Sequence, residues 1–405
     1  MDAIFYSGII LFAGFVFGEL VNLIKLPKVT GYILAGVLLN PGLIDFIPKE
    51  MTTHTDLITD VSLSFITFSV GGTLLYSKIK NLGKSILLIT IFEAEFAFVL
   101  VLIGIFLLSP LLVHFTSATS LTVYIPLALF FAALASPTDP SSTLAVMHQY
   151  KAKGKVSSTI MGVAAFDDIF GLLNFSIALS VAQVIVSGKS FAFESSILSP
   201  LYKIFGALIL GAVMGFVLNK LSVYVKKETA GNLVVVIFGV LLTSFGLAHY
   251  IGVDELLTTM TVGIMVVNFN PYQERIFEIL TENTEELIFV LFFTLSGLQL
   301  DFNVLFDYLP LALVFVGLRF IGKFFGTKFG ANISNADKKV KKFTFGGLIP
   351  QGGIVIGLAL IVKQHAEFSH IADIIISVII GATIIHEFVG PILAKYSLKK
   401  AGEIN

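Results

Sequence analysis

Two adjacent aspartates, Asp167 and Asp168, interrupt an otherwise apolar stretch, AAFDDIFGLLNF, at residues 164–175. A desolvated carboxylate holds either a proton or a nearby cation, so this pair points to ion chemistry. Adjacent residues on a helix point about 100° apart, so the two carboxylates are not expected to face one cavity together. One is expected to pair with a cationic side chain on a neighbouring helix, Lys323 being the best candidate and Arg319 the next, while the other faces a cavity.

Few other ionisable side chains are expected within the hydrocarbon depth of the membrane: Glu93, Glu95, Asp139, Arg319, Lys323 and Glu387. A charged side chain at the centre of a bilayer costs about 2.5 to 3.5 kcal/mol on insertion scales, so such residues pair or line a wet cavity. Glu93 and Glu95 are two residues apart, so only one is expected to face the core, as a structural partner of Arg319. His386 and Glu387 are expected to form a capping or interdomain pair, with contact to the core as the alternative.

A helix break is predicted in FFAALASPTDPSSTLAVMHQY at 130–150, where two prolines flank Thr138 and Asp139. Each proline removes a backbone donor and disfavours helix at the residue before it. Unwound backbone at membrane depth is tolerated only where it lines protein or water, so the break is expected beside the two aspartates. A second break is predicted at 350–353, within FGGLIPQGGIVIGLAL. The candidate partners around these breaks are Glu93, Glu95, Ser136, Ser141, Asn174 and Gln351.

Composition identifies a membrane protein. The 405 residues are 56% hydrophobic and 13% charged, with a mean hydropathy of +0.93, whereas soluble domains are roughly a quarter charged. The net charge of −1 and the lack of a basic recognition helix argue against a nucleic-acid partner. Because the chain has no cysteine, disulfides, thiol catalysis and cysteine-ligated zinc are excluded. No cofactor is expected.

A span needs about 20 apolar residues, which predicts an all-α polytopic chain with about thirteen crossings. Short loops predict a single membrane transport domain over 1–405 without a soluble domain. Broken helices at corresponding positions in two halves are typical of inverted repeats around a midplane site. The predicted crossings are 3–24, 30–47, 56–76, 85–109, 121–147, 156–187, 201–225, 229–250, 254–269, 285–300, 304–330, 342–363 and 371–396.

The basic residues of the connections predict the orientation, because cytoplasmic loops collect Lys and Arg. The odd-numbered connections and the C-terminal stretch hold 20 of them, whereas the even-numbered connections hold four, Lys49, Lys189, Lys203 and Lys363. The N-terminus is therefore expected outside and the C-terminus in the cytoplasm, which places the chain in the cell (cytoplasmic) membrane.

Five motifs occur in one order along the chain: LPKVTGYILAGVLLNPGL at 26–43, ASPTDP at 135–140, FDD at 166–168, LRFIGKFFG at 318–326 and GLIPQGG at 347–353. This order resembles the monovalent cation/proton antiporter superfamily, most closely its bacterial double-aspartate branch. The resemblance implies thirteen helices with two crossing discontinuous ones, a homodimer and elevator-type alternating access. It further implies a core subdomain at about 56–187 and 285–396, and a dimerisation subdomain at about 1–47 and 201–269.

The resemblance also implies site roles. Asp168 would be the main cation and proton ligand and Asp167 the partner of Lys323, while Thr138 and Asp139 would form the break. The chain departs from the pattern at Gln351 and Gly353, where relatives often carry Arg and Glu. In the single-aspartate branch Asn precedes the Asp and Glu stands four residues earlier; here Asp167 and Val163 occupy these positions, which favours the electrogenic type.

The predicted function is exchange of Na⁺, or Li⁺ as a surrogate, for H⁺, and not enzymatic catalysis. A K⁺/H⁺ antiporter of the same fold and a cation sensor that does not transport are the alternatives, and the lack of a nucleotide-binding module favours sodium. An intramembrane aspartyl protease is disfavoured because the Gly-x-Gly-Asp signature of its second helix is absent. A channel is disfavoured because no filter-like repeat is present.

Overall fold

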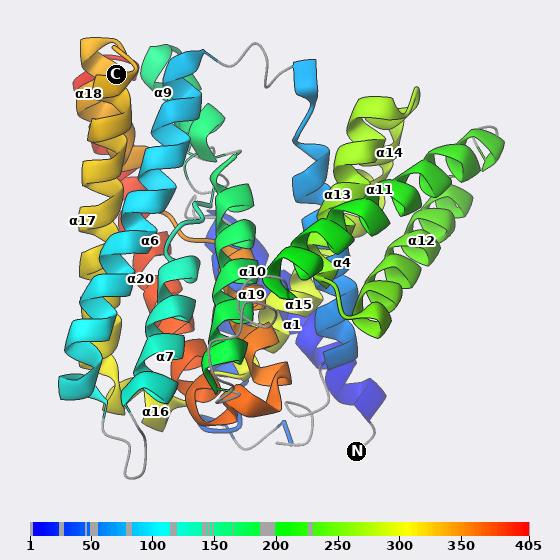
Figure 1. Ribbon diagram of the computed structural model, residues 1–405, viewed down its shortest axis with the longest axis horizontal. Coiled ribbons are helices and arrows are strands. Elements are labelled where there is room, and N and C mark those ends of the chain that lie inside the picture. Colours follow the sequence, from blue (N-terminus) through cyan, green and yellow to red (C-terminus); the bar gives the residue numbers. More distant parts are fainter. Residues whose placement is uncertain are drawn as a thin grey trace. The chain divides into compact units, whose positions relative to one another are not determined.

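The computed structural model describes residues 3–23, 28–44, 47–48, 56–77, 83–113, 120–139, 143, 146–147, 150–164, 166–186, 199–225 and 230–404. Their regular secondary structure is entirely helical, which confirms the predicted fold class (Figure 1). The chain divides into two compact units, one formed by Met1–Thr55, Leu82–Val186 and Phe293–Asn405, and the other by Asp56–Asn81 and Ser187–Phe292.

The first unit carries every candidate site residue and most of the helices. These are α1 (Ala3–Leu23), α2 (Lys28–Leu38), α6 (Lys84–Leu112), α7 (Ser120–Leu134), α9 (Lys155–Ala164), α10 (Asp167–Val186), α16 (Phe302–Asp307), α17 (Leu309–Ile333), α18 (Lys338–Phe343), the short η3 (Thr344–Gly347), α19 (Gly353–Gln364), η4 (Ala366–Phe368) and α20 (Ser369–Ala401).

The second unit contains α4 (Asp56–Gly72), α11 (Ser199–Val225), α12 (Ala230–Ile251), α13 (Glu255–Phe269), α14 (Gln273–Leu280) and the π-helical turn η2 (Thr281–Glu285), and α15 (Glu286–Leu298) runs from its end into the first unit. Glycines let α4 and α13 approach closely, since a Cβ atom at Gly71 would lie 2.0 Å from Met260 O. The hydroxyls of Thr67 and Thr259 are hydrogen-bonded across the same contact at 2.7 Å.

Seven stretches of the described chain are long and apolar enough to cross a membrane: 4–23, 84–112, 155–186, 201–223, 230–251, 309–333 and 366–401. Five shorter apolar helices accompany them, at 28–38, 57–72, 122–134, 255–269 and 354–364. A multi-pass membrane protein is therefore confirmed. The count of thirteen crossings, the inverted repeats and the division into core and dimerisation subdomains stay predictions.

Both predicted interruptions coincide with helix ends. α7 ends at Leu134, two residues before the Ser136-Pro137 step, because a residue that precedes proline avoids helical dihedrals. α19 begins only at Gly353, after Pro350, Gln351 and an extended Gly352. The first prediction extends to residues 140–142, which lie outside the described residues.

The predicted crossing at 156–187 differs from the structure in one respect. It was expected to be one continuous helix, but α9 ends at Ala164 and α10 begins at Asp167, with Phe166 in a turn between them. Aspartate stabilises the first turn of a helix, where backbone N–H groups point outward and the helix dipole favours negative charge. The two carboxylates thus begin α10 instead of lying in the middle of a helix.

Candidate functional site

Close packing of α6 against α17 positions the buried charges. A Cβ atom added at Gly326 would lie 2.2 Å from Phe92 O, and one at Gly322 would lie 2.7 Å from Ala97 Cα. Glycine at every fourth position lets two helices approach backbone to backbone, and α6 and α17 lie side by side in Figure 1. Lys323 follows Gly322 directly, and its side chain is fully buried between the helices.

The ammonium group of Lys323 lies between two carboxylates. Its Nζ donates hydrogen bonds to Glu93 Oε1 and, at 2.6 Å, to Thr138 Oγ1, and it lies 3.5 Å from Asp167 Oδ2. All four side chains are buried. Glu93 or Glu95 was expected to pair with Arg319. This expectation is wrong, because Glu93 accepts a hydrogen bond from Lys323 instead.

The guanidinium of Arg319 binds backbone from both breaks. Its Nε donates to Ala135 O at 3.0 Å, its Nη1 to Ile349 O at 2.6 Å, and its Nη2 to Pro137 O at 2.7 Å and Pro350 O at 3.3 Å. These carbonyls follow the C-terminal end of α7 and precede α19, where the chain leaves them without helical donors. Arg319 thus satisfies the unwound backbone and adds positive charge at the negative end of α7.

The two breaks also bond each other directly. Asp139 N donates to Pro350 O at 3.1 Å, and Gln351 Nε2 donates to Leu134 O at 2.7 Å. Asp139 packs against Gly352, where a Cβ atom would lie 2.7 Å from Asp139 Cβ. Its carboxylate therefore stands near the N-terminal end of α19, where negative charge is favoured.

The hydroxyl of Thr143, which was not among the predicted site residues, also joins the two breaks. Thr143 is fully buried and donates to Gly347 O at 2.8 Å, a bond that joins the end of one break to the residues before the other. The signal was the short run of hydroxyl residues after Pro140. Ser141, the member of that run named as a candidate, lies outside the described residues.

Asp167 and Asp168 occupy the first turn of α10 beside this junction. A Cβ atom at Gly171, one turn further, would lie 2.3 Å from Pro137 Cγ, so α10 packs directly on the first break. Within the described part of the chain, neither oxygen of Asp167 and not Oδ1 of Asp168 has a hydrogen-bond partner, although these atoms are buried. Asp168 lies within electrostatic reach of Asp139, Asp167 and Lys323.

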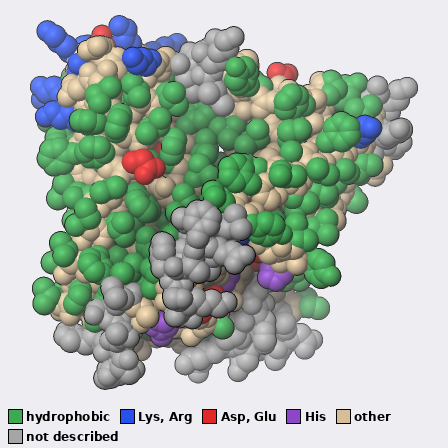
Figure 2. Space-filling model, in the orientation of Figure 1, with side chains coloured by type: hydrophobic (Ala, Val, Ile, Leu, Met, Phe, Trp, Pro, Cys, Tyr) green, Lys and Arg blue, Asp and Glu red, His purple; other side chains and the backbone are tan. Residues whose placement is uncertain are grey.

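Glu95 lies apart from the Lys323 cluster. It is half-buried, and its Oε1 accepts a hydrogen bond from Asn174 Nδ2 at 3.3 Å. The same amide group donates to Ser136 Oγ at 3.3 Å, which links α6, α10 and the first break. Figure 2 shows one small acidic patch within a largely hydrophobic face of the molecule.

His386 and Glu387 have separate partners in the interior, which corrects their interpretation as a pair. His386 Nδ1 lies 2.8 Å from Gln351 Oε1, so α20 supports the second break. Glu387 Oε2 accepts a hydrogen bond from Thr30 Oγ1 of α2 at 3.1 Å. Thr30, which the sequence analysis did not single out, stands in the KVTGY motif of α2.

Among the described residues no three His, Asp or Glu side chains gather as a resident metal site would require. A cation bound here would instead use the oxygens of Asp167 and Asp168, supplemented by hydroxyl or backbone oxygens and water, which is the donor set of transported monovalent cations. The same oxygens accept protons. The arrangement is therefore able to hold either a cation or a proton.

Known proteins are similar to this chain in sequence and in fold. The profile of the family described as "Sodium/hydrogen exchanger, transmembrane" matches residues 8–399. A "Na(+)/H(+) antiporter" of Enterococcus hirae is 26% identical over 387 residues, covering 93% of this chain and 92% of the relative. An "Ammonium/H(+) antiporter subunit AmhT" of Alkalihalophilus pseudofirmus is 22% identical over 402 residues, covering 98% of this chain and 96% of the relative.

The fold comparison agrees. The structure of the sodium proton antiporter MjNhaP1 from Methanocaldococcus jannaschii at pH 8 matches with a TM-score of 0.76 at 18% sequence identity, covering 98% of both chains. The family profile extends over nearly the entire chain, including both breaks and the paired aspartates. The chain therefore belongs to the sodium/hydrogen exchanger family of monovalent cation/proton antiporters.

Proposed function

We propose that this antiporter exchanges cytoplasmic Na⁺, with Li⁺ as a surrogate, for external H⁺, and that Asp168 with Asp167 binds both ions in turn. The observation that carries the proposal is the position of the two carboxylates. They begin a helix beside two joined chain breaks, and Oδ1 of Asp168 is buried without a hydrogen-bond partner among the described residues, whereas Asp167 has Lys323 Nζ at 3.5 Å. A deprotonated carboxylate attracts a cation, and a protonated one releases it, so binding of the two ions is mutually exclusive.

The proposed roles follow from the neighbours of each group. Asp168 is the cation and proton ligand, because Lys323 contacts Asp167 and not Asp168. Thr138 and Asp139 shape the cavity through the break. Arg319, Gln351 and Thr143 hold both breaks in place, so the ligand oxygens keep their geometry while the ion changes.

We infer that exchange is electrogenic, with Asp167 as a second proton carrier. When Asp167 accepts a proton, Lys323 keeps an anionic partner in Glu93, so its charge is not left unpaired in the interior. Asp167 can thus alternate between an ion pair with Lys323 and a protonated state, which lets two protons enter for each Na⁺ that leaves.

We also propose an oligomeric state, a membrane and an orientation for the protein. It acts as a homodimer in the cytoplasmic membrane, with its N-terminus outside, its C-terminus in the cytoplasm and elevator-type alternating access. Support for the orientation comes from the exposed lysines of α18 and of the last two turns of α20: Lys338, Lys339, Lys342, Lys395, Lys399 and Lys400. Figure 2 shows Lys and Arg side chains gathered at the upper left, where Figure 1 marks α18 and the C-terminus. Cytoplasmic ends of membrane proteins carry this excess.

Proton flux into proteoliposomes that contain a pH dye tests the proposal. Na⁺ and Li⁺ should drive proton movement, Asp168→Asn should abolish it, and Asp307→Asn, at an exposed position of α16, should behave as wild type. Movement driven by K⁺ alone would overturn the sodium assignment. Na⁺-driven movement that survives in Asp168→Asn would overturn the site, and cation binding without any movement would identify a sensor.

Ammonium is included among the tested cations because the relative from Alkalihalophilus pseudofirmus is named for ammonium/proton exchange and aligns over 98% of this chain. Ammonium donates hydrogen bonds, whereas Na⁺ only accepts oxygen ligands. The carboxylate oxygens of Asp167 and Asp168 would bind either ion, so the flux ratio between NH₄⁺ and Na⁺ decides the substrate.

A further inference from the structure

The helix that leads to the aspartates lacks a cap of its own. The N-cap position of α9 is Gly154, whose carbonyl accepts the first helical bond from Ser158 N at 3.1 Å. An N-cap side chain normally binds the N–H groups of the second and third helical residues, here Val156 and Ser157. Glycine has no side chain to do so, and these donors therefore need an acceptor from elsewhere.

The carboxylate of Glu403 supplies it from the other end of the chain. Glu403 Oε1 accepts from Val156 N at 2.7 Å, and Oε2 accepts from Ser157 N at 2.8 Å. The lack of a side chain at position 154 is itself part of the arrangement, since a Cβ atom there would lie 2.2 Å from Glu403 Cδ. A negative charge at the N-terminal end of α9 also interacts favourably with the helix dipole.

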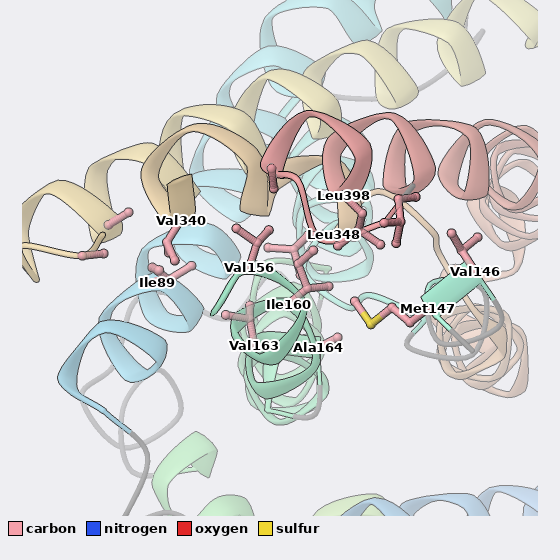
Figure 3. Packing of buried hydrophobic residues seen from close by; sticks show 14 residues of the cluster. Ile89, Val146, Met147, Val156, Ile160, Val163, Ala164, Val340, Leu348 and Leu398 are labelled. Carbon is pink, nitrogen blue, oxygen red and sulfur yellow. The ribbon is translucent and has the colours of Figure 1, made fainter. Parts of the chain in front are cut away.

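Apolar packing fixes Glu403 in this position. Ile404, Ala401 and Leu398 are buried in a cluster with Val156 and Ile160 of α9. Figure 3 shows Leu398 and Leu348 facing Val156 and Ile160, so the cluster joins the end of α20, α9 and the second break. Lys339 Nζ donates to Ala401 O at 2.7 Å and holds the last turn of α20.

α9 connects this contact to the cation site. It has 10 residues, a length of about 15 Å, and Asp167 follows its last residue by three positions. Its middle also contacts η3, just before the second break, because a Cβ atom at Gly347 would lie 2.5 Å from Ile160 Cδ1. A displacement of α9 along its axis would therefore shift the first turn of α10 relative to Lys323 and the breaks.

We propose that Glu403 is a positioning residue for cation binding: by capping α9 from the C-terminal end, it holds Asp167 and Asp168 in the arrangement that binds the cation from the cytoplasmic side. The inference rests on the proposed function. If only part of the population keeps α9 in place, the apparent affinity falls by that fraction while the rate at saturation is retained.

Two variants remove the same contact from opposite sides. Glu403→Ala deletes the acceptor, and Gly154→Ala displaces it by steric conflict. Each should raise the apparent KM for Na⁺ about five-fold, which is the change in equilibrium constant that corresponds to the loss of a typical helix cap, about 1 kcal/mol. The maximal rate should stay within about two-fold of wild type. The double variant should be no worse than either single one, and Glu403→Asp, which keeps the charge, should recover part of the affinity. Glu274→Ala, at an exposed position of α14, is the matched control.

Hydrogen–deuterium exchange in detergent gives a readout that does not depend on transport. Glu403→Ala should speed amide exchange both in α9 and in residues 166–172, and Glu274→Ala should leave both unchanged. Faster exchange confined to α9 would overturn the positioning role. So would an unchanged KM in Glu403→Ala, provided that the wild type transports Na⁺. Wild-type protein that moves no protons would instead overturn the proposed function, and the exchange pattern would still decide whether Glu403 controls the aspartate turn.

Discussion

At the scale of single residues, the central feature is that the ammonium group of Lys323 contacts Glu93 and Thr138 and lies 3.5 Å from Asp167. Lys323 with Glu93 and Asp167 gives a net negative group when both carboxylates are ionised, and the guanidinium of Arg319, whose donors bind backbone carbonyls, lies within electrostatic reach of both. A proton on one of them restores neutrality at little cost in buried charge. This charge balance is the physical reason to propose that Asp167 takes up a proton when it leaves Lys323 and loses it when the ion pair forms again.

The voltage dependence of exchange tests this assignment. Lys323→Gln should retain Na⁺-driven proton movement but lose its response to membrane potential, because Asp167 then stays protonated through the cycle. Lys328→Gln, the same substitution at an exposed position of α17, is the control and should remain voltage-dependent. The measurement is the exchange rate in proteoliposomes at potentials set by K⁺ gradients and valinomycin, and a response in Lys323→Gln equal to that of wild type would disprove the assignment.

The sequence was informative about which residues meet and less so about which atoms bond. Residue type and apolar context singled out Asp167, Lys323 and Arg319 as an interior set. Glu93 was predicted to pair with Arg319 because the two carry opposite charges. The guanidinium of Arg319 instead donates hydrogen bonds to four backbone carbonyls. Those carbonyls became acceptors only when two breaks that are distant in sequence came together, which no local pattern encodes.

At the scale of elements, the approach of α6 and α17 decides the site geometry. Gly326→Ala places a methyl group about where Phe92 O now lies, 2.2 Å from the ideal Cβ position, so the two helices must separate. Overpacking of this kind costs about 1 to 3 kcal/mol, and it also moves Lys323 away from Glu93. Gly317→Ala, on the same helix with nothing within 4 Å of the added Cβ, is the control.

Thermal unfolding in detergent, together with the exchange rate, measures this effect. Gly326→Ala should lower both the unfolding temperature and the rate, and Gly317→Ala should change neither. Equal stability of the two variants would show that α6 and α17 are not held at backbone contact.

The cap of α18 gives a pH-dependent prediction. The hydrogen bond from Lys339 N, followed by that from Lys155, lowers the pKa of Asp337 below its ordinary value. A lowered native pKa stabilises the fold above the unfolded pKa of about 3.9, and this stability is lost as the pH falls through the native value. Asp337→Asn should therefore unfold at a lower temperature than wild type at pH 7, and the difference should vanish in acid.

Unfolding temperatures of both proteins across pH 3 to 8 check this, with Asp307→Asn on α16 as the control. A difference between wild type and Asp337→Asn that stays constant over the whole range would contradict the prediction.

Helix ends were predictable where proline marks them and missed where it does not. Pro137 and Pro350 identified both breaks, because proline excludes helix by its own geometry. The division between α9 and α10 has no proline or glycine at the step, and the apolar residues on both sides read as one helix. What marks it is the aspartate pair itself, which favours a helix start.

At the scale of the whole molecule, the orientation is the property most exposed to test. The chain has no cysteine, so single cysteines can be introduced without a background. Asn303→Cys, in the connection expected outside, should react with a membrane-impermeant thiol reagent in intact cells. Lys399→Cys should react only after the cells are permeabilised, and the reverse pattern would invert the proposed topology.

The claim that Na⁺ and H⁺ compete for Asp168 is tested most directly by proton release on cation binding. Purified protein in detergent and weak buffer, held at the pH where the site is half protonated, is titrated with Na⁺ while the pH is recorded. Wild type should acidify the solution in a saturable way, and Asp168→Asn should not acidify it. Na⁺ binding to wild type without release of protons would contradict the claim.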